Sequence, residues 1–131
     1  MKNNPVGGIY RTNSVFITGT RYEPPLPEIL PYQLRAFFEE LPYKIMPPIY
    51  LAAYTHAEFV KIHPFLDGNG RTSRMIMNYQ LMRNGFFPIS IEQEVRLSYF
   101  KHLECYALYG ELEPFADMVA DLEEKRLREQ L

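Results

Sequence analysis

Residues 63–74 constrain the fold of this chain more than any other segment, because they end one helix and begin another. Pro64 disfavours the helical conformation for the residue before it, so a helix that approaches this point ends at His63. Gly68 and Gly70 lack a Cβ atom and allow backbone conformations that other residues avoid. The segment therefore predicts two helices joined by a tight, glycine-containing loop.

Apolar residues recur at helical spacing on both sides of this loop. Leu34, Phe37 and Leu41 follow one another at steps of three and four residues, which is typical of an amphipathic helix. The pair Asn84-Gly85 is a common signal for the end of a helix. We expect helices over residues 31–41, 47–63, 70–84 and 92–109, and from residue 114 to the C-terminus. The expected fold class is mostly α.

The N-terminal part of the chain has a different composition. β-Branched and aromatic residues lie at positions 9–11 and 15–18, with turn-forming residues between them. This pattern predicts a β-hairpin over residues 8–20. Prolines at positions 24, 25, 27 and 31 then deny the backbone the donors and the freedom that a helix needs. We expect this second stretch to be an extended connector.

Length and composition exclude several classes of protein. A chain of 131 residues forms about one domain, which we take to span residues 1–131. With 47% apolar residues and a net charge of -2, it is expected to be a soluble globule that does not bind nucleic acid. The single cysteine excludes an internal disulfide, and no apolar run approaches the roughly 20 residues of a membrane helix. We expect a location in the bacterial cytoplasm and no membrane partner.

The glycine-containing loop has the chemistry of a phosphate site. Gly68 and Gly70 allow successive backbone N–H groups to point at one place, just before a helix begins. The partial positive charge at the N-terminus of that helix favours an anion there. Arg71 and Arg74 are three residues apart and therefore share a helix face, and their planar guanidinium groups suit phosphate oxygens. The loop is therefore expected to bind the phosphates of a nucleotide.

Two further residues of this segment suit metal binding and proton transfer. Asp67 offers a hard oxygen ligand beside the loop, and Mg²⁺ is usually held by one or two carboxylates together with substrate phosphates. His63 is the natural proton acceptor, because imidazole titrates near neutral pH. We expect His63 to deprotonate an incoming hydroxyl group.

Other phosphate and metal motifs fit this segment less well. The G-x-x-x-x-G-K-[ST] spacing of a P-loop and the third glycine of a dinucleotide fingerprint are both missing. In a calcium loop that began at Asp67, Thr72 and Asn78 would occupy the sixth and twelfth positions, which require glycine and glutamate. A zinc site made from His56, His63 and Asp67 would lack a fourth ligand. We therefore expect His56 to pack in the core.

These residues carry a resemblance to a known family. Residues 63–74 resemble the signature of the Fic family, H-x-F-x-[DE]-G-N-G-R-x-x-R, with every defined position filled. Residues 8–11, 15–17 and 24–25 resemble the family's upstream flap hairpin and connector, and residues 84–86 and 96–99 resemble its downstream part. The chain is most similar to the group that includes the animal endoplasmic-reticulum Fic enzyme and bacterial relatives.

The resemblance implies a Fic-fold helical bundle with an N-terminal β-hairpin flap. It implies protein adenylylation, in which AMP moves from ATP to a Ser, Thr or Tyr hydroxyl of a target protein and pyrophosphate is released. By the same resemblance His63 is the general base, Asp67 binds Mg²⁺, Arg71 contacts the β-phosphate and Arg74 the γ-phosphate. The implied ATP-binding residues are Asp67, Gly68, Asn69, Gly70, Arg71, Thr72, Ser73, Arg74, Tyr99, Phe100, Thr18 and Gly19.

The resemblance also implies which residues lie beside the adenine and which segment binds the target protein. The flap is implied to align the target protein's backbone by strand addition and to close over the nucleotide. Tyr99 and Phe100 match positions where relatives place aromatic side chains beside the adenine, although core packing explains them equally well. Relatives carry a small polar residue about a turn or two further on, where this chain has Cys105, Tyr106 and Ala107. Nucleotide preference is therefore left open.

A regulatory motif of the family has no match in this chain. Many Fic proteins carry an inhibitory helix, [ST]-x-x-x-E-[GN], whose glutamate pairs with the last arginine of the signature. Here Ser90 precedes Glu94 by four residues, but Val95 follows. We favour loss of that helix by truncation over a separate inhibitor protein, and we expect a constitutively active chain. Oligomeric state is not specified by the sequence, and a homodimer stays open.

Alternative functions and interpretations also stay open. A Fic-like transferase of UMP or phosphate is one, although Gly70 and Arg74 argue against the phosphorylating variant. A module that merely holds a nucleotide and binds a partner protein is another. Arg96 suits a structural ion pair as well as a functional role. The methionines at 75, 77 and 82 are expected to pack in the core.

Overall fold

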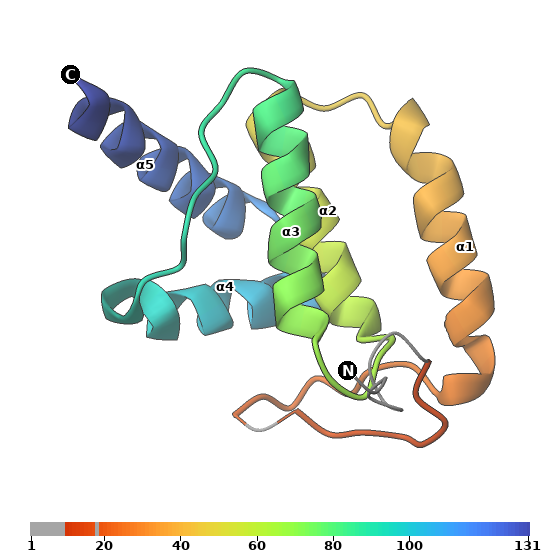
Figure 1. The fold of residues 1–131 in the computed structure, drawn as a ribbon. Helices are drawn as coiled ribbons and strands as arrows, with labels where there is room; N and C mark the ends of the chain where they lie inside the picture. The colour runs from red at the N-terminus through yellow and green to blue at the C-terminus, as the bar shows by residue number, and fades with distance from the viewer. Residues whose placement is uncertain (1–9, 18) are drawn as a thin grey trace, which may run out of the picture.

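Figure 1 shows the computed structural model of the chain, which describes residues 10–17 and 19–131. The α-helices are α1 (Leu30–Glu40), α2 (Pro48–Ile62), α3 (Asn69–Arg83), α4 (Arg96–Tyr109) and α5 (Glu113–Gln130). Short 3-10 helices, η1 (Pro27–Ile29), η2 (Leu41–Tyr43) and η3 (Gln93–Val95), precede or follow them. The mostly helical prediction is confirmed, with helix bounds close to those expected from the sequence. No helix in the described ranges is both long and apolar enough to cross a bilayer.

Helix α2 lies at the centre of the bundle. It contacts α1, α3, α4 and α5, and Figure 1 shows α3 running alongside it with α1 on one side and α4 and α5 on the other. The side chains of Ala52, Ala53 and Ala57 are small and buried, which lets neighbouring helices approach the α2 backbone closely. The loop between α2 and α3 is therefore attached to the most constrained part of the fold.

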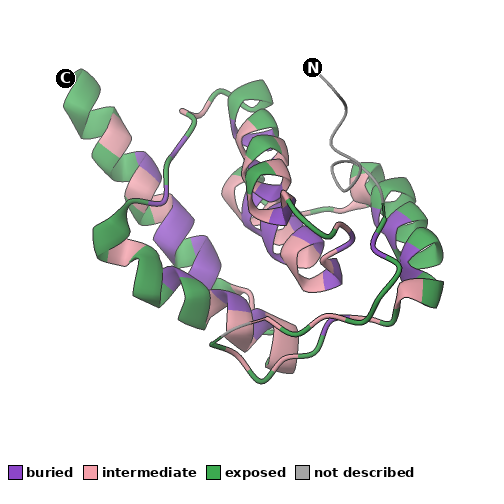
Figure 2. Cartoon of the chain, turned by 60° about the horizontal axis from the view of Figure 1, so that its bottom comes forward, coloured by how far each residue is buried: buried purple, intermediate pink, exposed green. Residues whose placement is uncertain are grey.

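Two groups of buried side chains pack against α2, and Figure 2 shows the buried residues on the inner faces of the helices. The larger group joins α2 to α3, α4 and α5, and includes Met77, Leu81, Tyr99, Leu103, Phe115 and Val119. The smaller group joins α1 to the C-terminal half of α2 and consists of Leu30, Leu34, Phe37, Phe59 and Ile62. Since Phe59 and Ile62 belong to the last turn of α2, the second group fixes the helix end next to His63.

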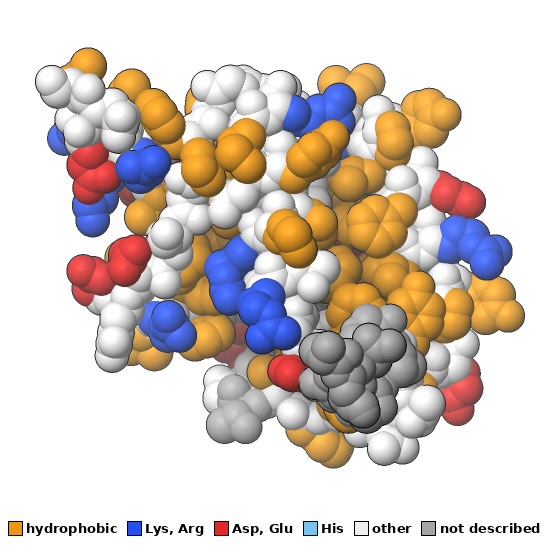
Figure 3. Space-filling view, in the orientation of Figure 1, with side chains coloured by type: hydrophobic (Ala, Val, Ile, Leu, Met, Phe, Trp, Pro, Cys, Tyr) orange, Lys and Arg blue, Asp and Glu red, His pale blue; other side chains and the backbone are white. Residues whose placement is uncertain are grey.

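The expectation that the three methionines of α3 pack in the core was wrong for two of them. Met77 is fully buried, but Met75 and Met82 are 65% and 53% exposed. Residues seven apart lie on one face of a helix, and Tyr79 lies between these two on the same outer face. Figure 3 shows hydrophobic side chains over this side of α3 and toward α1. The spacing of Met75 and Met82 shows that they share one face of α3, but it does not show whether that face is turned toward the core or toward solvent.

The predicted β-hairpin is not confirmed. Residues 10–17 and 19–20 form no strand, and Tyr10 instead makes a single antiparallel bridge with Phe65 of the α2–α3 loop. The Tyr10 and Phe65 rings stack with their centroids 6.0 Å apart. The backbone N–H of Arg11 donates to the carbonyl of Pro64 at 3.0 Å. Within the described residues, the pairing partner of this segment is therefore the loop that carries the candidate site.

Residues 20–22 of the N-terminal segment form hydrogen bonds with α4 and α2. The Thr20 hydroxyl donates to Glu104 Oε2 at 2.6 Å, and the Arg21 backbone N–H donates to the same oxygen at 3.2 Å. These two hydrogen bonds lower the pKa of the Glu104 carboxyl. The Tyr22 hydroxyl donates to the carbonyl of Lys61 at 2.9 Å. The segment therefore lies across the ends of α2 and α4 (Figure 1).

Candidate active site

Helix α2 ends at His63 in a left-handed backbone conformation, with φ 51° and ψ 59°. Its N–H donates to the carbonyl of Phe59 at 3.0 Å, which closes the last turn. A residue other than glycine in this region costs on the order of 1–3 kcal/mol, and such strain concentrates at functional sites. Pro64 follows directly, as the sequence predicted for a helix end.

The imidazole of His63 is suited to accept a proton. Burial, and after it the positive charge of Arg11, lowers the pKa of His63 below its ordinary value. The ring is therefore neutral near neutral pH, which a general base requires. Its Nδ1 atom is buried and has no hydrogen-bond partner within the described part of the chain.

Arg11 is a residue of this site that the sequence analysis missed. Its side chain is only 4% exposed, and its Nε donates to the His63 carbonyl at 2.6 Å. Nη2 donates to the carbonyls of Pro25 at 2.5 Å and Ile62 at 3.4 Å, and Nη1 to that of Asn13 at 3.0 Å. The one available signal was an arginine within an apolar stretch that was expected to form a strand.

The amide of Asn69 holds the shape of the α2–α3 loop. Its Nδ2 donates to the Phe65 carbonyl at 2.7 Å, and its Oδ1 accepts from the Phe65 N–H at 3.0 Å. The side chain is 5% exposed, so Asn69 is mostly engaged with the loop itself. Gly68, with φ 89°, precedes the first residue of α3, and its carbonyl accepts from the Thr72 N–H at 3.0 Å. What remains for a ligand at these positions is the backbone N–H groups at the start of the helix.

Two arginines fold back over the two glycines of the loop. An ideal Cβ at Gly68 would lie 3.1 Å from Arg71 Nη2, and one at Gly70 would lie 3.1 Å from Arg74 Nη1. Neither arginine forms an ion pair with another of the described residues. Figure 3 shows basic side chains gathered beside the N-terminal end of α3. Backbone donors and both guanidinium groups therefore converge where an anion is favoured by the helix dipole.

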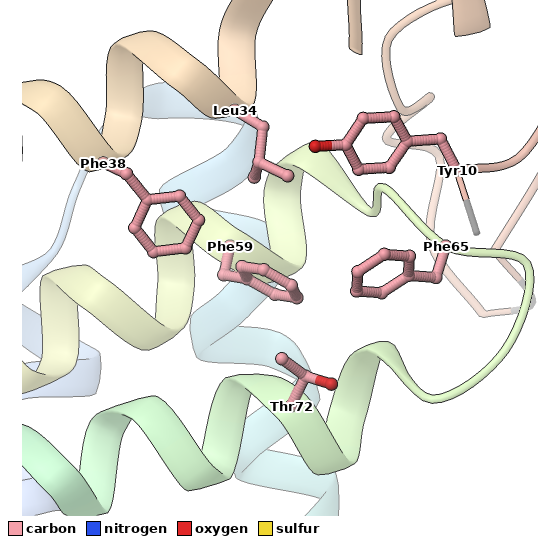
Figure 4. Close-up of a pocket in the computed structure, with 6 residues that line it drawn as sticks. All are labelled: Tyr10, Leu34, Phe38, Phe59, Phe65 and Thr72. Atoms are coloured by element: carbon pink, nitrogen blue, oxygen red, sulfur yellow. The ribbon is translucent and has the colours of Figure 1, made fainter. Parts of the chain in front are cut away.

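The side chains of Thr72 and Ser73 point away from this convergence. Ser73 is fully buried, and its hydroxyl donates to the Gly70 carbonyl at 2.9 Å. Thr72 lines an apolar pocket of about 420 Å³ between α1 and α3, shown in Figure 4. The other residues that line it are Tyr10, Leu34, Phe38, Phe59 and Phe65. Any contact of Thr72 or Ser73 with phosphate in this arrangement would come from the backbone.

The remaining predicted ATP-binding residues lie in different surroundings. Tyr99 is 5% exposed, and its hydroxyl is 2.7 Å from His56 Nε2. Phe100 is 56% exposed, with its ring centroid 5.2 Å from that of Tyr99, so its outer face is free for stacking. Gly19 is exposed with φ 90°, and Thr18 lies outside the described residues. Tyr99 is therefore a core residue in this arrangement, and of the two rings only that of Phe100 is exposed.

The predicted core position of His56 is confirmed, and it has a consequence for stability. Burial lowers the pKa of His56 from 6.5 to about 4, with a smaller raising effect of the Ser73 backbone and a lowering effect of Arg74. Between these two pH values the unfolded chain binds a proton that the native protein does not. The free energy of unfolding is therefore highest above about pH 6.5, and the titration of His56 lowers it as the pH falls toward 4.

We expect the free energy of unfolding to fall by about 2 kcal/mol between pH 7 and pH 5 because of this group. Urea unfolding at the two pH values measures the change, and a His56→Gln variant serves as the control because it cannot titrate. The loss should be smaller in the variant. Equal losses in both proteins would show that His56 does not contribute.

Among the described residues, only the carboxylate of Asp67 is a candidate metal ligand at this site, so the protein does not surround an ion by itself. The described residues contain no group of three or more His, Cys, Asp or Glu side chains able to surround an ion. The alternative zinc site from His56, His63 and Asp67 therefore gains no support. Asp67 is exposed, directly precedes Gly68 in the loop, and forms no ion pair with the described residues. It fits a cation that takes its other ligands from a nucleotide and water.

The fold and the site together define a helical protein with an anion-binding turn between two central helices and a histidine at the end of the first. Residues 1–81 match the sequence profile of the Fic/DOC family, which covers more than half of the chain. The chain belongs to this family.

Individual relatives agree with this assignment. A protein adenylyltransferase Fic from Nematostella vectensis is 42% identical over 123 residues, which cover 92% of this chain and 28% of that protein. The structure of Fic-1 from C. elegans has 33% identity and a TM-score of 0.82, with 96% of this chain and 37% of that chain covered. A Fic domain containing signaling protein from Bacteroides thetaiotaomicron has 28% identity and a TM-score of 0.79, with 92% and 53% covered. The chain thus spans little more than a quarter of the length of the first relative.

Proposed function

We propose that this chain is a protein adenylyltransferase, which transfers AMP from ATP to a Ser, Thr or Tyr hydroxyl of a target protein and releases pyrophosphate. The observation that carries the proposal is that His63 ends α2 and that the glycine turn which follows it in the same loop is covered by two arginines. The relative from Nematostella vectensis, 42% identical, is named for this activity. Each part of the reaction has a residue on this chain that suits it.

The triphosphate is held at the start of α3. Backbone N–H groups beside Gly68 and Gly70 face it, and Arg71 and Arg74 contact the β- and γ-phosphates from above the two glycines. Since these groups are already in position before the nucleotide arrives, little reorganisation is needed as charge develops on the leaving pyrophosphate. Asn69 keeps the loop in this shape through its two bonds to Phe65.

His63 removes the proton from the target hydroxyl as that oxygen forms a bond to the α-phosphorus. The bond between the α-phosphorus and the bridging oxygen breaks, and the electron pair leaves with pyrophosphate. The transfer needs positioning and charge stabilisation more than covalent help from the protein. The lowered pKa of His63 keeps the imidazole available as the proton acceptor.

Mg²⁺ fits this site through Asp67. The carboxylate is exposed beside the phosphate-binding turn and forms no ion pair with other described residues. When bound, Mg²⁺ neutralises phosphate charge and orients the phosphate oxygens. Asp67 then acts as the protein's share of the coordination shell.

Two segments that flank the site are proposed to bind the adenine of ATP and the target protein. Phe100 on α4 offers an exposed ring on which the adenine stacks. Thr18 and Gly19 are proposed as further nucleotide contacts, on the family resemblance alone. The flap, residues 8–20, is proposed to pair with an extended stretch of the target protein as an added strand. Phe16, which is 80% exposed, is available for a contact with the target. A separate inhibitor protein or an additional segment would control access to Arg74.

The position of the label in ATP tests this function. The purified chain is incubated with Mg²⁺, a cell lysate and one of three labelled nucleotides: ATP labelled on the α-phosphate, ATP labelled on the γ-phosphate, or UTP labelled on the α-phosphate. AMP transfer places only the α-label on protein. Label from γ-labelled ATP alone would identify a kinase, label from α-labelled UTP would identify UMP transfer, and no label from any nucleotide would contradict the proposed function.

A further inference from the structure

Arg11 connects the N-terminal segment to the end of α2 at the candidate base. Its guanidinium donates to the carbonyls of Ile62 and His63, and its backbone N–H donates to the carbonyl of Pro64. Arg11 therefore donates hydrogen bonds to three successive carbonyls at the end of the helix, those of residues 62, 63 and 64. The side chain is 4% exposed, so these bonds are sheltered from competing water.

The same guanidinium also ties the two arms of the N-terminal segment together. It donates to Asn13 on the outgoing arm and to Pro25 on the returning arm. A buried arginine needs such partners for its donors, and all of those found here are backbone carbonyls. The carbonyls at the C-terminal end of α2 also carry partial negative charge, which favours a cation at this place.

His63 is held in a conformation that it would not keep by itself. Its φ of 51° is unfavourable for a residue with a Cβ atom, and such a conformation persists only where the surroundings determine it. The shortest of the bonds to this residue is the one from Arg11 Nε to the His63 carbonyl, at 2.6 Å. That bond fixes the peptide from which the imidazole projects.

We propose that Arg11 is a positioning residue for the base, which holds His63 in its left-handed conformation and so directs the imidazole toward the phosphate-binding turn. The proposal rests on the function proposed above for His63. All the side-chain hydrogen bonds of Arg11 among the described residues go to backbone carbonyls, and none goes to the phosphate-binding turn. Arg11 is therefore proposed to act on His63 and not on the nucleotide.

The charge of Arg11 gives a second measure of the same contact. Arg11 lowers the pKa of His63, and the other charged groups nearby lie elsewhere: Lys61 over the Tyr106 ring, and Asp67 exposed in the loop. Arg71 and Arg74 lie over the glycines of the turn. Loss of Arg11 should therefore shift the titration of His63 upward whether or not substrate is present.

The test compares Arg11→Met and Arg11→Lys with a matched control, Arg21→Met. Arg21 is an exposed arginine of the same segment that bonds the Tyr109 hydroxyl and lies over its ring, 5.8 Å from the centroid. We expect Arg11→Met to lower kcat for AMP transfer by at least about tenfold, since a small displacement of a catalytic group is costly. KM for ATP should stay within about twofold, and Arg11→Lys should recover part of kcat. Arg21→Met should change neither constant.

The titration midpoint of His63, measured by NMR without nucleotide, should rise in Arg11→Met and not in Arg21→Met. A folded Arg11→Met protein with wild-type kcat and an unchanged midpoint would overturn the proposal, as would a loss that lies wholly in KM for ATP. If Arg11→Met does not fold, the same criteria apply to Arg11→Lys. A wild-type chain that transfers no AMP would refute the proposed function, whereas the NMR result would still decide the role of Arg11.

Discussion

Replacing His63 with alanine is expected to lower AMP transfer by about 10²- to 10⁴-fold, the range that a positioned general base contributes. The imidazole is the neutral group at the end of α2, and no backbone donor of the phosphate-binding turn depends on it. ATP affinity should therefore stay within about twofold, because uniform binding is untouched when a group acts only in the transition state. Transfer of α-label measures the first quantity, and calorimetric titration with Mg²⁺–ATP measures the second.

A matched control for this variant is His102→Ala. His102 is a partly exposed histidine of α4 that lines a depression between α4 and α5 with Asp117 and Leu122. Its loss should leave transfer at the wild-type rate. Retention of transfer in His63→Ala would show that another group is the base, and an equal loss in both variants would indicate a general effect on the fold.

The helical part of the fold was predictable because its signals are local. Pro64 and the glycines mark the α2–α3 junction within a few residues, and Asn84-Gly85 ends α3 next to its observed last residue, Arg83. Each of these signals acts on its own neighbourhood, so tertiary structure did not need to be known. The prediction of a phosphate site at residues 63–74 uses local signals of the same kind.

The N-terminal segment was predicted less well because its partners are distant in sequence. Arg11 meets His63 across 52 positions, and Thr20 meets Glu104 across 84. Alternation of β-branched and aromatic residues indicates an extended chain but does not say what it pairs with. Here that chain makes its backbone bonds with the α2–α3 loop, so the expected second strand is absent from the described residues.

Side-chain roles within the signature also depended on contacts that spacing does not show. Asn69, Thr72 and Ser73 stand among phosphate-contacting positions in the sequence, yet their side chains bond or face the protein itself. The two charges beside the turn, Asp67 and Arg71, are exposed, and their roles as ligands stay predictions. The spacing of a short motif therefore does not show which of its side chains are turned toward the protein itself.

Gly68→Ala and Gly85→Ala form a pair that separates phosphate binding from backbone strain. The two glycines have nearly the same left-handed φ, 89° and 86°. A Cβ at Gly68 would lie 3.1 Å from Arg71 Nη2, whereas one at Gly85 would meet nothing within 4 Å. Both variants should lose about 1–2 kcal/mol of stability, the usual cost of a side chain in this conformation.

Only Gly68→Ala should also bind ATP more weakly, by about tenfold, because its methyl group makes the Arg71 guanidinium shift and so weakens a charged hydrogen bond. Thermal unfolding measures the shared loss, and calorimetric titration with Mg²⁺–ATP measures the difference. Equal affinities in the two variants would contradict the placement of the triphosphate at this turn. Because strain is matched within the pair, a selective loss in Gly68→Ala can only come from the space above that glycine, where the arginine lies.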